Sequence, residues 1–355
     1  MSTPAFNSPV TRQYTDTSSV LIRSYSRPNS VINCKPPNTS TLSQNGTLCI
    51  QLLAKDRSRR RSTRPGIQMT LVDDTFGRRN VIVTPSEILA YDLVQGPLVR
   101  WSYIADRSVP CPPTAVLLHG ILGSRKNWGT FARRLAKEFP NWQFLLVDLR
   151  CHGDSASIKK TGPHTVASAA LDVLKLLGHL RVIPRVIIGH SFGGKVALSM
   201  VEQAAKPLAR PVRVWVLDAT PGKVRAGRDG DDHPAELINF LKAFPNEVIS
   251  KREVISALVH EGFSKDVAQW VVTNLRQTNP SNSSSGFSWI FNLDGIAEMG
   301  VVEDVPRGVH VNFLKAERSL HRWALGDLQR IHAAEEQASQ EGGGVEMHVL
   351  EDAGH

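Results

Sequence analysis

Residues 186–195 read VIIGHSFGGK, and this stretch decides how the chain folds. The apolar run at 186–188 is typical of a strand that is buried on both faces of a sheet. Ser191 then stands between Gly189 and Gly193, and a helical stretch follows. This order predicts a sharp strand-to-helix turn that exposes the serine hydroxyl, with small residues on both sides because a Cβ there would clash. We therefore expect Ser191 to act as a nucleophile.

A second turn motif, HGILG at residues 119–123, directly follows the apolar run 115–118. Acyl transfer needs backbone N–H donors that point at the oxyanion before the reaction begins. The N–H of Ile121 in this turn and the N–H of Phe192 after the serine are the expected pair. A strand-to-helix turn without chemistry is the alternative interpretation.

Short apolar runs alternate with amphipathic stretches from residue 80 to residue 350, which is typical of a mostly parallel sheet with helices on both faces. We expect strands at 80–83, 98–103, 115–118, 144–147, 186–188, 212–217, 310–314 and 345–350. We expect helices at 128–139, 166–177, 192–204 and 325–338. The predicted fold class is therefore α/β.

Residues 221–305 interrupt this alternation. They contain three expected helices, at 235–243, 251–259 and 265–275, and then a polar run. The insertion is too long for a simple connection, so we expect a cap that folds over the sheet and forms one wall of a pocket. The predicted organisation is a leader at 1–64, a linker and first strand region at 65–97, and one domain at 98–355.

The net charge of +9 is concentrated in the leader, where ten Lys or Arg residues stand against two Asp. The rest of the chain is nearly neutral, which argues against a nucleic-acid partner. The leader is also rich in Ser and Thr and has no long apolar segment, a composition that resembles an organelle transit peptide. Plastid (chloroplast) import is the favoured reading and mitochondrial import the alternative. A merely disordered basic tail is the other interpretation.

Neither a disulfide framework nor a metal site is expected. Of the four cysteines, Cys34 and Cys49 lie in the leader, and Cys111 and Cys151 lack the spacing of zinc ligands. No apolar run approaches the ~20 residues that a membrane-spanning helix needs, so at most peripheral membrane contact is expected.

Four motifs, in this order, resemble the signature of the α/β-hydrolase superfamily, and within it a small serine-esterase branch with bacterial, plant and animal mitochondrial members. They are HGILGS at 119–124, DLRCHGDS at 148–155, GHSFGGK at 189–195 and AGH at 353–355. The resemblance covers residues 98–355. It implies the α/β-hydrolase fold with a helical cap, and chemistry without a cofactor or metal. We interpret the DLRCHGDS motif at 148–155 as structural, with side chains that connect loops beneath the site.

The resemblance also implies a histidine base after the last strand, where His355 stands. Its imidazole is mostly neutral near pH 7, so it can take the proton from Ser191. In this family a further helix normally follows that histidine, whereas the present sequence stops at His355.

The third member of the predicted triad is an acid. The family's usual acid position, after the strand at 310–314, is occupied here by Ser319. Asp218, which ends the strand at 212–217, is the expected substitute. Asp294 and Glu317 remain rival acids.

These residues predict a serine hydrolase that cleaves a carboxylic ester or thioester of a small acyl or lipid substrate through an acyl-enzyme. Two alternatives stay open. One is an acyltransferase or lipid-remodelling enzyme that uses the same triad with an alcohol in place of water. The other is a non-catalytic receptor that holds a ligand in the pocket.

Overall fold

A computed structural model describes residues 88–99, 111–204 apart from 159 and 161, 212–222, 234–297 apart from 246, 280 and 282–284, 305–319, and 323–354 apart from 342. The predicted leader, the strand expected at 80–83 and the expected base His355 lie outside these residues.

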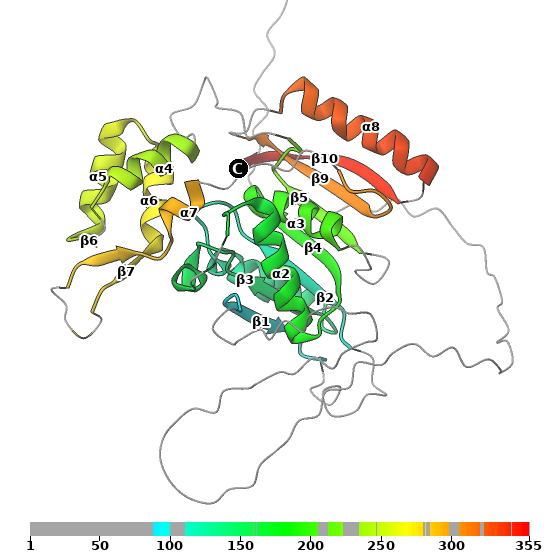
Figure 1. The fold of residues 1–355 in the computed structure, drawn as a ribbon, viewed down its shortest axis with the longest axis horizontal. Helices are drawn as coiled ribbons and strands as arrows, with labels where there is room; N and C mark the ends of the chain where they lie inside the picture. Colours follow the sequence, from blue (N-terminus) through cyan, green and yellow to red (C-terminus); the bar gives the residue numbers. More distant parts are fainter. Residues whose placement is uncertain are drawn as a thin grey trace, which may run out of the picture. The chain divides into compact units, whose positions relative to one another are not determined.

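A seven-stranded sheet forms the centre of the fold, in the order β1-β3-β2-β4-β5-β9-β10 (Figure 1). The strands are β1 (Tyr91–Gln95), β2 (Thr114–Leu118), β3 (Gln143–Val147), β4 (Pro184–His190), β5 (Arg213–Leu217), β9 (His310–Arg318) and β10 (Gly344–Gly354). Among the described strands of this sheet, β1 runs antiparallel to its neighbour β3, and the other pairs are parallel. Every residue of β2 and β3 is buried, as continuous apolar runs predict for central parallel strands. The expected α/β class is confirmed.

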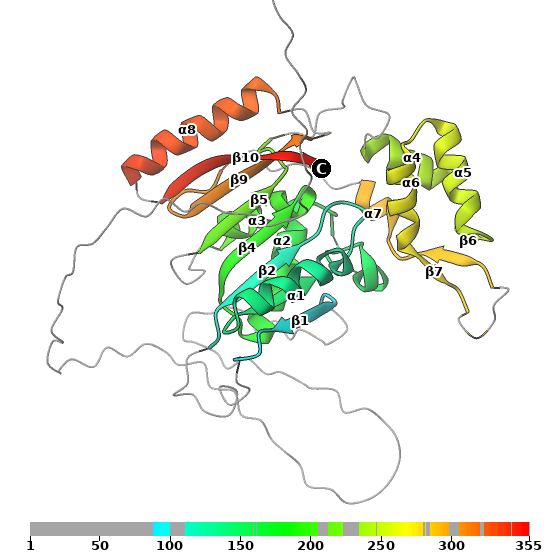
Figure 2. The same ribbon diagram turned by 180° about the vertical axis from the view of Figure 1, so that it is seen from behind.

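Helices cover both faces of this sheet (Figures 1 and 2). On one face lie α2 (Val166–Leu180), α3 (Phe192–Gln203) and α8 (Leu325–Glu341), and on the other lies α1 (Gly129–Glu138). Alternate residues of β2 enter different cores, because successive side chains of a strand point to opposite faces. Val116 packs with the first group of helices, and Leu117 packs with α1.

The first strand differs from the prediction. Leu98 and Val99, expected to begin a strand, lie in a turn, and their N–H groups donate to Pro140 O and Gly96 O. Gly96 and Pro97 explain this turn, since glycine and proline favour turn conformations. Residues 100–103 lie outside the described part. Strand β1 was not predicted, because its sequence YDLVQ mixes polar and apolar residues at a partly exposed sheet edge.

Residues 234–297 carry a separate small layer, the cap (Figure 1). It contains α4 (Pro234–Ala243), α5 (Lys251–Glu261), α6 (Lys265–Val271), α7 (Leu293–Ala297) and the antiparallel sheet β6-β8-β7 (Glu247–Val248, Phe287–Trp289, Leu275–Gln277). The side chains of Ser250 and Ser264 cap α5 and α6 at their N-termini. The third predicted helix extended to residue 275, whereas α6 ends at Val271 because the chain turns there to enter β7. This small sheet was not predicted.

Candidate active site

Ser191 lies at the turn between β4 and α3, in a strained backbone conformation with φ 50° and ψ −115°. Side chains other than glycine rarely adopt a positive φ, and such strain concentrates at functional sites. The turn closes so tightly that a Cβ on Gly189 would come 2.5 Å from Gly194 N, and a Cβ on Gly193 would come 2.6 Å from His119 O. Both positions therefore require glycine, as the sequence predicted.

Ser191 opens onto a cavity of about 810 Å³. One wall is the HGILG turn, another is the carboxyl ends of β4 and β5, and a third is the cap. Leu237 of α4 and Val267 and Trp270 of α6 give the cap wall an apolar surface, to which Ser264 and Asp266 add polar groups. A mostly apolar cavity with few polar groups is typical of a small-molecule site.

The HGILG turn packs directly against the serine. A Cβ on Gly120 would lie 3.4 Å from the Cβ of Ser191. Within the described residues, no acceptor is found for the N–H of Ile121, which lines the cavity, or for the N–H of Phe192 at the start of α3. The neighbouring N–H of Leu122 donates to Nε2 of His152 over 3.1 Å. The N–H of Leu122 therefore already has an acceptor, unlike the other two N–H groups in the described part of the chain.

Asp218 is buried directly after β5, and its carboxylate accepts three hydrogen bonds from other described residues. Its Oδ2 accepts from the hydroxyl of Ser319 at 2.7 Å, and its Oδ1 accepts from Ala316 N at 3.2 Å and Trp323 Nε1 at 3.3 Å. The structure thus brings the expected acid into contact with the serine at the family's usual acid position. Trp323 is a partner that the sequence analysis missed.

The two rival acids lie elsewhere. The side chain of Asp294 is 84% exposed and pairs with Lys242 at 2.9 Å on the cap. Glu317 is exposed, and its Oε2 accepts from Asp352 N at 2.8 Å. His355 is outside the described residues; the residue before it, Gly354, ends β10 and lines the cavity together with Ser191.

Residues 115–355 match the sequence profile of the alpha/beta hydrolase family. The chain belongs to the α/β-hydrolase family. The sn-1-specific diacylglycerol lipase ABHD11 of Xenopus laevis is 31% identical over 62% of this chain and 63% of its own length, so this chain spans less than two thirds of that relative. The "Probable alcohol acetyltransferase" of Saccharomyces cerevisiae is 28% identical over 57% of each chain. A solved marine microorganism esterase shares the fold, with a TM-score of 0.55 and 21% identity over 76% of this chain and 92% of its own.

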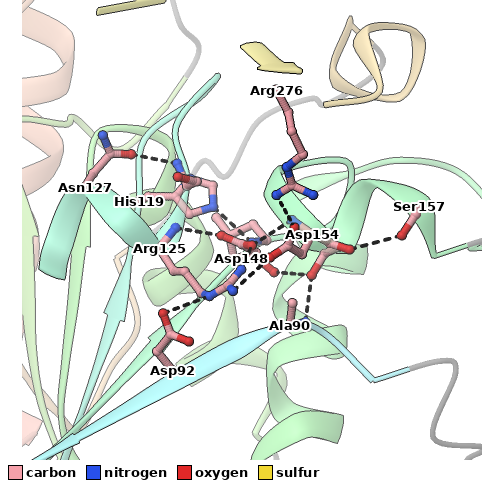
Figure 3. A network of polar contacts seen from close by, with 12 residues as sticks. Ala90, Asp92, His119, Arg125, Asn127, Asp148, Asp154, Ser157 and Arg276 are labelled. Atoms are coloured by element: carbon pink, nitrogen blue, oxygen red, sulfur yellow. Dashed lines mark hydrogen bonds and ion pairs between the residues drawn. The ribbon is translucent and has the colours of Figure 1, made fainter. Parts of the chain in front are cut away.

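In this α/β-hydrolase, the motif at 148–155 ties the core together, as its structural interpretation predicted (Figure 3). The buried carboxylate of Asp148 accepts from the backbone and guanidinium of Arg125 and from Asp154 N. Asp154 also binds Arg125 and the cap residue Arg276, and the hydrogen bond from Arg276 is the main reason that the pKa of Asp154 lies below its ordinary value. The network therefore links the cap to the core.

Two buried histidines of the α/β-hydrolase core, His119 and His152, have a structural role: each hydrogen-bonds two backbone groups of neighbouring loops. His119 accepts from Leu149 N at Nε2 and donates from Nδ1 to Gly120 O, and His152 accepts from Leu122 N and donates to Arg150 O. Burial lowers the pKa of His119 to about 4 and that of His152 to about 3. Both imidazoles are neutral near pH 7, and both ring nitrogens are occupied. Neither can serve as the base for Ser191.

Lys195 is a residue whose role the sequence analysis missed. Lys195 is the fourth residue of α3, and its Nζ donates to Thr220 O at 2.9 Å and to Gly222 O at 2.7 Å. Both carbonyls belong to the segment that directly follows Asp218. Burial lowers the pKa of this lysine to about 8. The signal was a lone lysine among the apolar residues and glycines at 192–198, at the start of the helical stretch.

The described residues contain no group of three potential metal ligands, and none of their helices has the length and apolarity needed to cross a bilayer.

Proposed function

We propose that this chain is a serine hydrolase that cleaves carboxylic esters or thioesters, with Ser191 as nucleophile, His355 as general base and Asp218 as the acid that orients the base. The observation that carries the proposal is the strained Ser191 turn, which presents a hydroxyl to a large apolar cavity beside two N–H donors. A glycine-rich turn with a purely structural role would not need a strained serine at this point.

The proposed mechanism is nucleophilic acyl transfer through an acyl-enzyme. Ser191 Oγ attacks the carbonyl carbon of the substrate while the imidazole takes its proton. The N–H groups of Ile121 and Phe192 stabilise the negative charge on the carbonyl oxygen. The imidazolium then protonates the leaving alcohol or thiol, and an acyl-enzyme remains. The same base then takes a proton from a water molecule that attacks the acyl-enzyme, and the carboxylic acid product is released.

Asp218 is the acid best supported by its surroundings. It is buried, and its carboxylate is fixed by three donors, which is what a group that orients an imidazole requires. The rivals Asp294 and Glu317 are exposed and bind partners outside the cavity lining. We therefore place Asp218 in the triad.

The substrate class that fits is an acyl ester with an apolar chain. The cap side chains Leu237, Val267 and Trp270 offer an apolar wall to such a chain. The name of the ABHD11 relatives, sn-1-specific diacylglycerol lipase, supports a lipid ester. The name of the yeast relative supports the acyltransferase alternative, in which an alcohol attacks the acyl-enzyme. Import into a plastid, or alternatively a mitochondrion, remains a proposal that rests on the leader's composition alone.

The decisive experiment compares the wild-type chain with Ser191→Ala on p-nitrophenyl esters of increasing acyl length. We expect turnover by the wild type only, and we expect a fluorophosphonate probe to label the wild type only. Equal turnover by both proteins would refute the mechanism. An unlabelled, folded wild type would favour a receptor, and acyl transfer to added alcohols in preference to water would favour the acyltransferase.

A further inference from the structure

The oxyanion turn is held in an unfavourable backbone conformation. Gly123 N donates to Gly120 O at 3.1 Å, so residues 120–123 form a turn with Ile121 and Leu122 at its centre. Leu122 has φ 55°, a left-handed conformation that a residue with a Cβ rarely adopts. Something outside the turn must therefore hold this peptide in place, because the turn's own sequence does not favour it.

Both polar groups of Leu122 are held by residues outside the turn. Its N–H donates to His152 Nε2 at 3.1 Å, and its carbonyl accepts from Nδ2 of Asn274 at 2.8 Å. Asn274 belongs to the cap and lies 152 residues further along the chain. Asn274 is only 3% exposed, so this hydrogen bond is shielded from water.

The side chain of Leu122 is also held by the cap. It is fully buried and belongs to the cap's own hydrophobic cluster, with Val271 and Leu275 among its members. Asn274 stands between those two residues, and its backbone carbonyl accepts from Ile290 N at 3.0 Å, which fixes it to the cap's small sheet. The cap thus contacts the oxyanion turn through the side chain and the carbonyl of Leu122, the residue that follows the expected donor Ile121.

We propose that Asn274 is a positioning residue that sets the oxyanion turn, so that docking of the cap completes the oxyanion hole. This inference rests on the proposed serine hydrolase function. The Nδ2 donor fixes the peptide plane after Leu122, and His152 fixes the plane before it. The N–H of Ile121 belongs to the next peptide plane toward the N-terminus, so holding these two planes sets the direction in which it points. Asn274 contributes no atom to the reaction itself.

The test uses Asn274→Asp, which keeps the shape of the side chain but removes the donor, and Asn274→Leu, which removes it without adding a charge. We expect kcat to fall about 10- to 100-fold with little change in KM, because a small misplacement of a reacting group costs rates of that order. Affinity for an alkyl trifluoromethyl ketone, whose Ser191 adduct places an oxyanion in the hole, should fall in parallel. Affinity for the carboxylic acid product should not.

Arg276→Gln is the matched control. It lies two residues further on in the same cap segment and binds Asp154, not the oxyanion turn. Because exposed ion pairs contribute little, we expect its trifluoromethyl ketone affinity to stay within about twofold of wild type. Circular dichroism identifies any variant that fails to fold, and a folded Asn274 variant of either kind suffices.

The outcomes distinguish failure of the positioning role of Asn274 from failure of the proposed serine hydrolase function. A folded Asn274→Asp or Asn274→Leu protein with wild-type kcat and wild-type ketone affinity overturns the positioning role and leaves the serine hydrolase proposal standing. An equal loss in Arg276→Gln also overturns it, since the effect would then come from cap docking in general. A wild-type protein that hydrolyses no ester and resists fluorophosphonate overturns the proposed function and, with it, this inference.

Discussion

Oγ of Ser319 lies 2.7 Å from Oδ2 of Asp218 and donates a hydrogen bond to it across 101 residues of sequence. The two residues stand at the ends of β9 and β5, which are parallel neighbours paired through Leu217 and Leu314. A carboxylate carried by either strand end would therefore reach nearly the same point beside the cavity.

This relationship predicts that the acid can be moved between the two strands. Asp218→Asn should lower kcat about 10³- to 10⁴-fold, because in the proposed triad the base His355 would lose the group that orients it. The double variant Asp218→Asn with Ser319→Asp should recover at least about tenfold of that loss, since the carboxylate returns from the neighbouring strand. Steady-state kinetics on one p-nitrophenyl ester measures both effects. A wild-type kcat in Asp218→Asn would show that Asp218 is not the proposed acid, and it would favour Asp294 or Glu317 instead.

Much of this core could be predicted from residues near one another in sequence. The runs that became β2 and β3 are apolar at nearly every position, and a strand buried on both faces requires that pattern. The Ser191 turn was predicted because its two glycines lie within the motif. Asp218 was chosen as the expected acid because neighbouring parallel strands end at the same edge of the sheet; it lies in contact with Ser319, and its role as the acid stays a prediction.

The features that sequence reasoning missed depend on contacts between distant segments. In the sequence, Asn274 and Lys195 look like any other polar or charged residue. In the structure, Asn274 donates to the carbonyl of Leu122, and Lys195 donates to the carbonyls of Thr220 and Gly222. Nothing in the local sequence around either residue identifies those carbonyls. Strand β1 was missed for a related reason, because a partly exposed edge strand lacks the apolar run that marks a central one.

The tight turn at Ser191 predicts that alanine in place of Gly193 destabilises the protein, whereas alanine in place of Gly178, a glycine outside the turn, should stabilise it. Gly193→Ala places a Cβ against Leu118 O and His119 O, so it should destabilise the fold by about 2–3 kcal/mol and abolish fluorophosphonate labelling. Gly178→Ala, on the exposed side of α2, meets no atom within 4 Å and should stabilise by about 0.5–1 kcal/mol through its helix propensity. Urea denaturation followed by circular dichroism measures both. A fully active and stable Gly193→Ala protein would contradict the geometry of the turn.

The buried histidines predict a loss of stability in mild acid. Burial lowers the pKa of His119 to about 4 and that of His152 to about 3, from 6.5. As the pH falls below 6.5, the unfolded chain binds protons that the folded chain cannot bind, so the free energy of unfolding decreases. Between pH 7.5 and 5.5 the loss should be roughly 1–1.5 kcal/mol for each histidine.

Urea denaturation at these two pH values checks that prediction. His152→Gln removes one titrating group while an amide oxygen can still accept from Leu122 N, so its stability should depend less steeply on pH. His332→Gln changes an exposed histidine of α8 and serves as the control. An equal pH dependence in the wild type and in His152→Gln would contradict the assignment of a depressed pKa to His152.

The cap wall of the cavity predicts how acyl length is selected. Val267 lines the cavity from α6, so Val267→Trp should fill the part of the cavity that a long acyl chain would occupy. We expect kcat/KM for long-chain p-nitrophenyl esters to fall about tenfold or more, while the acetate ester changes little, because steric exclusion acts only on the longer chain. Val259→Trp, on the exposed face of α5 and outside the cavity lining, is the matched control and should leave both values unchanged. If Val267→Trp lowers kcat/KM equally for every ester, the acyl chain does not lie against α6, and the leaving group is the part of the substrate that meets the cap.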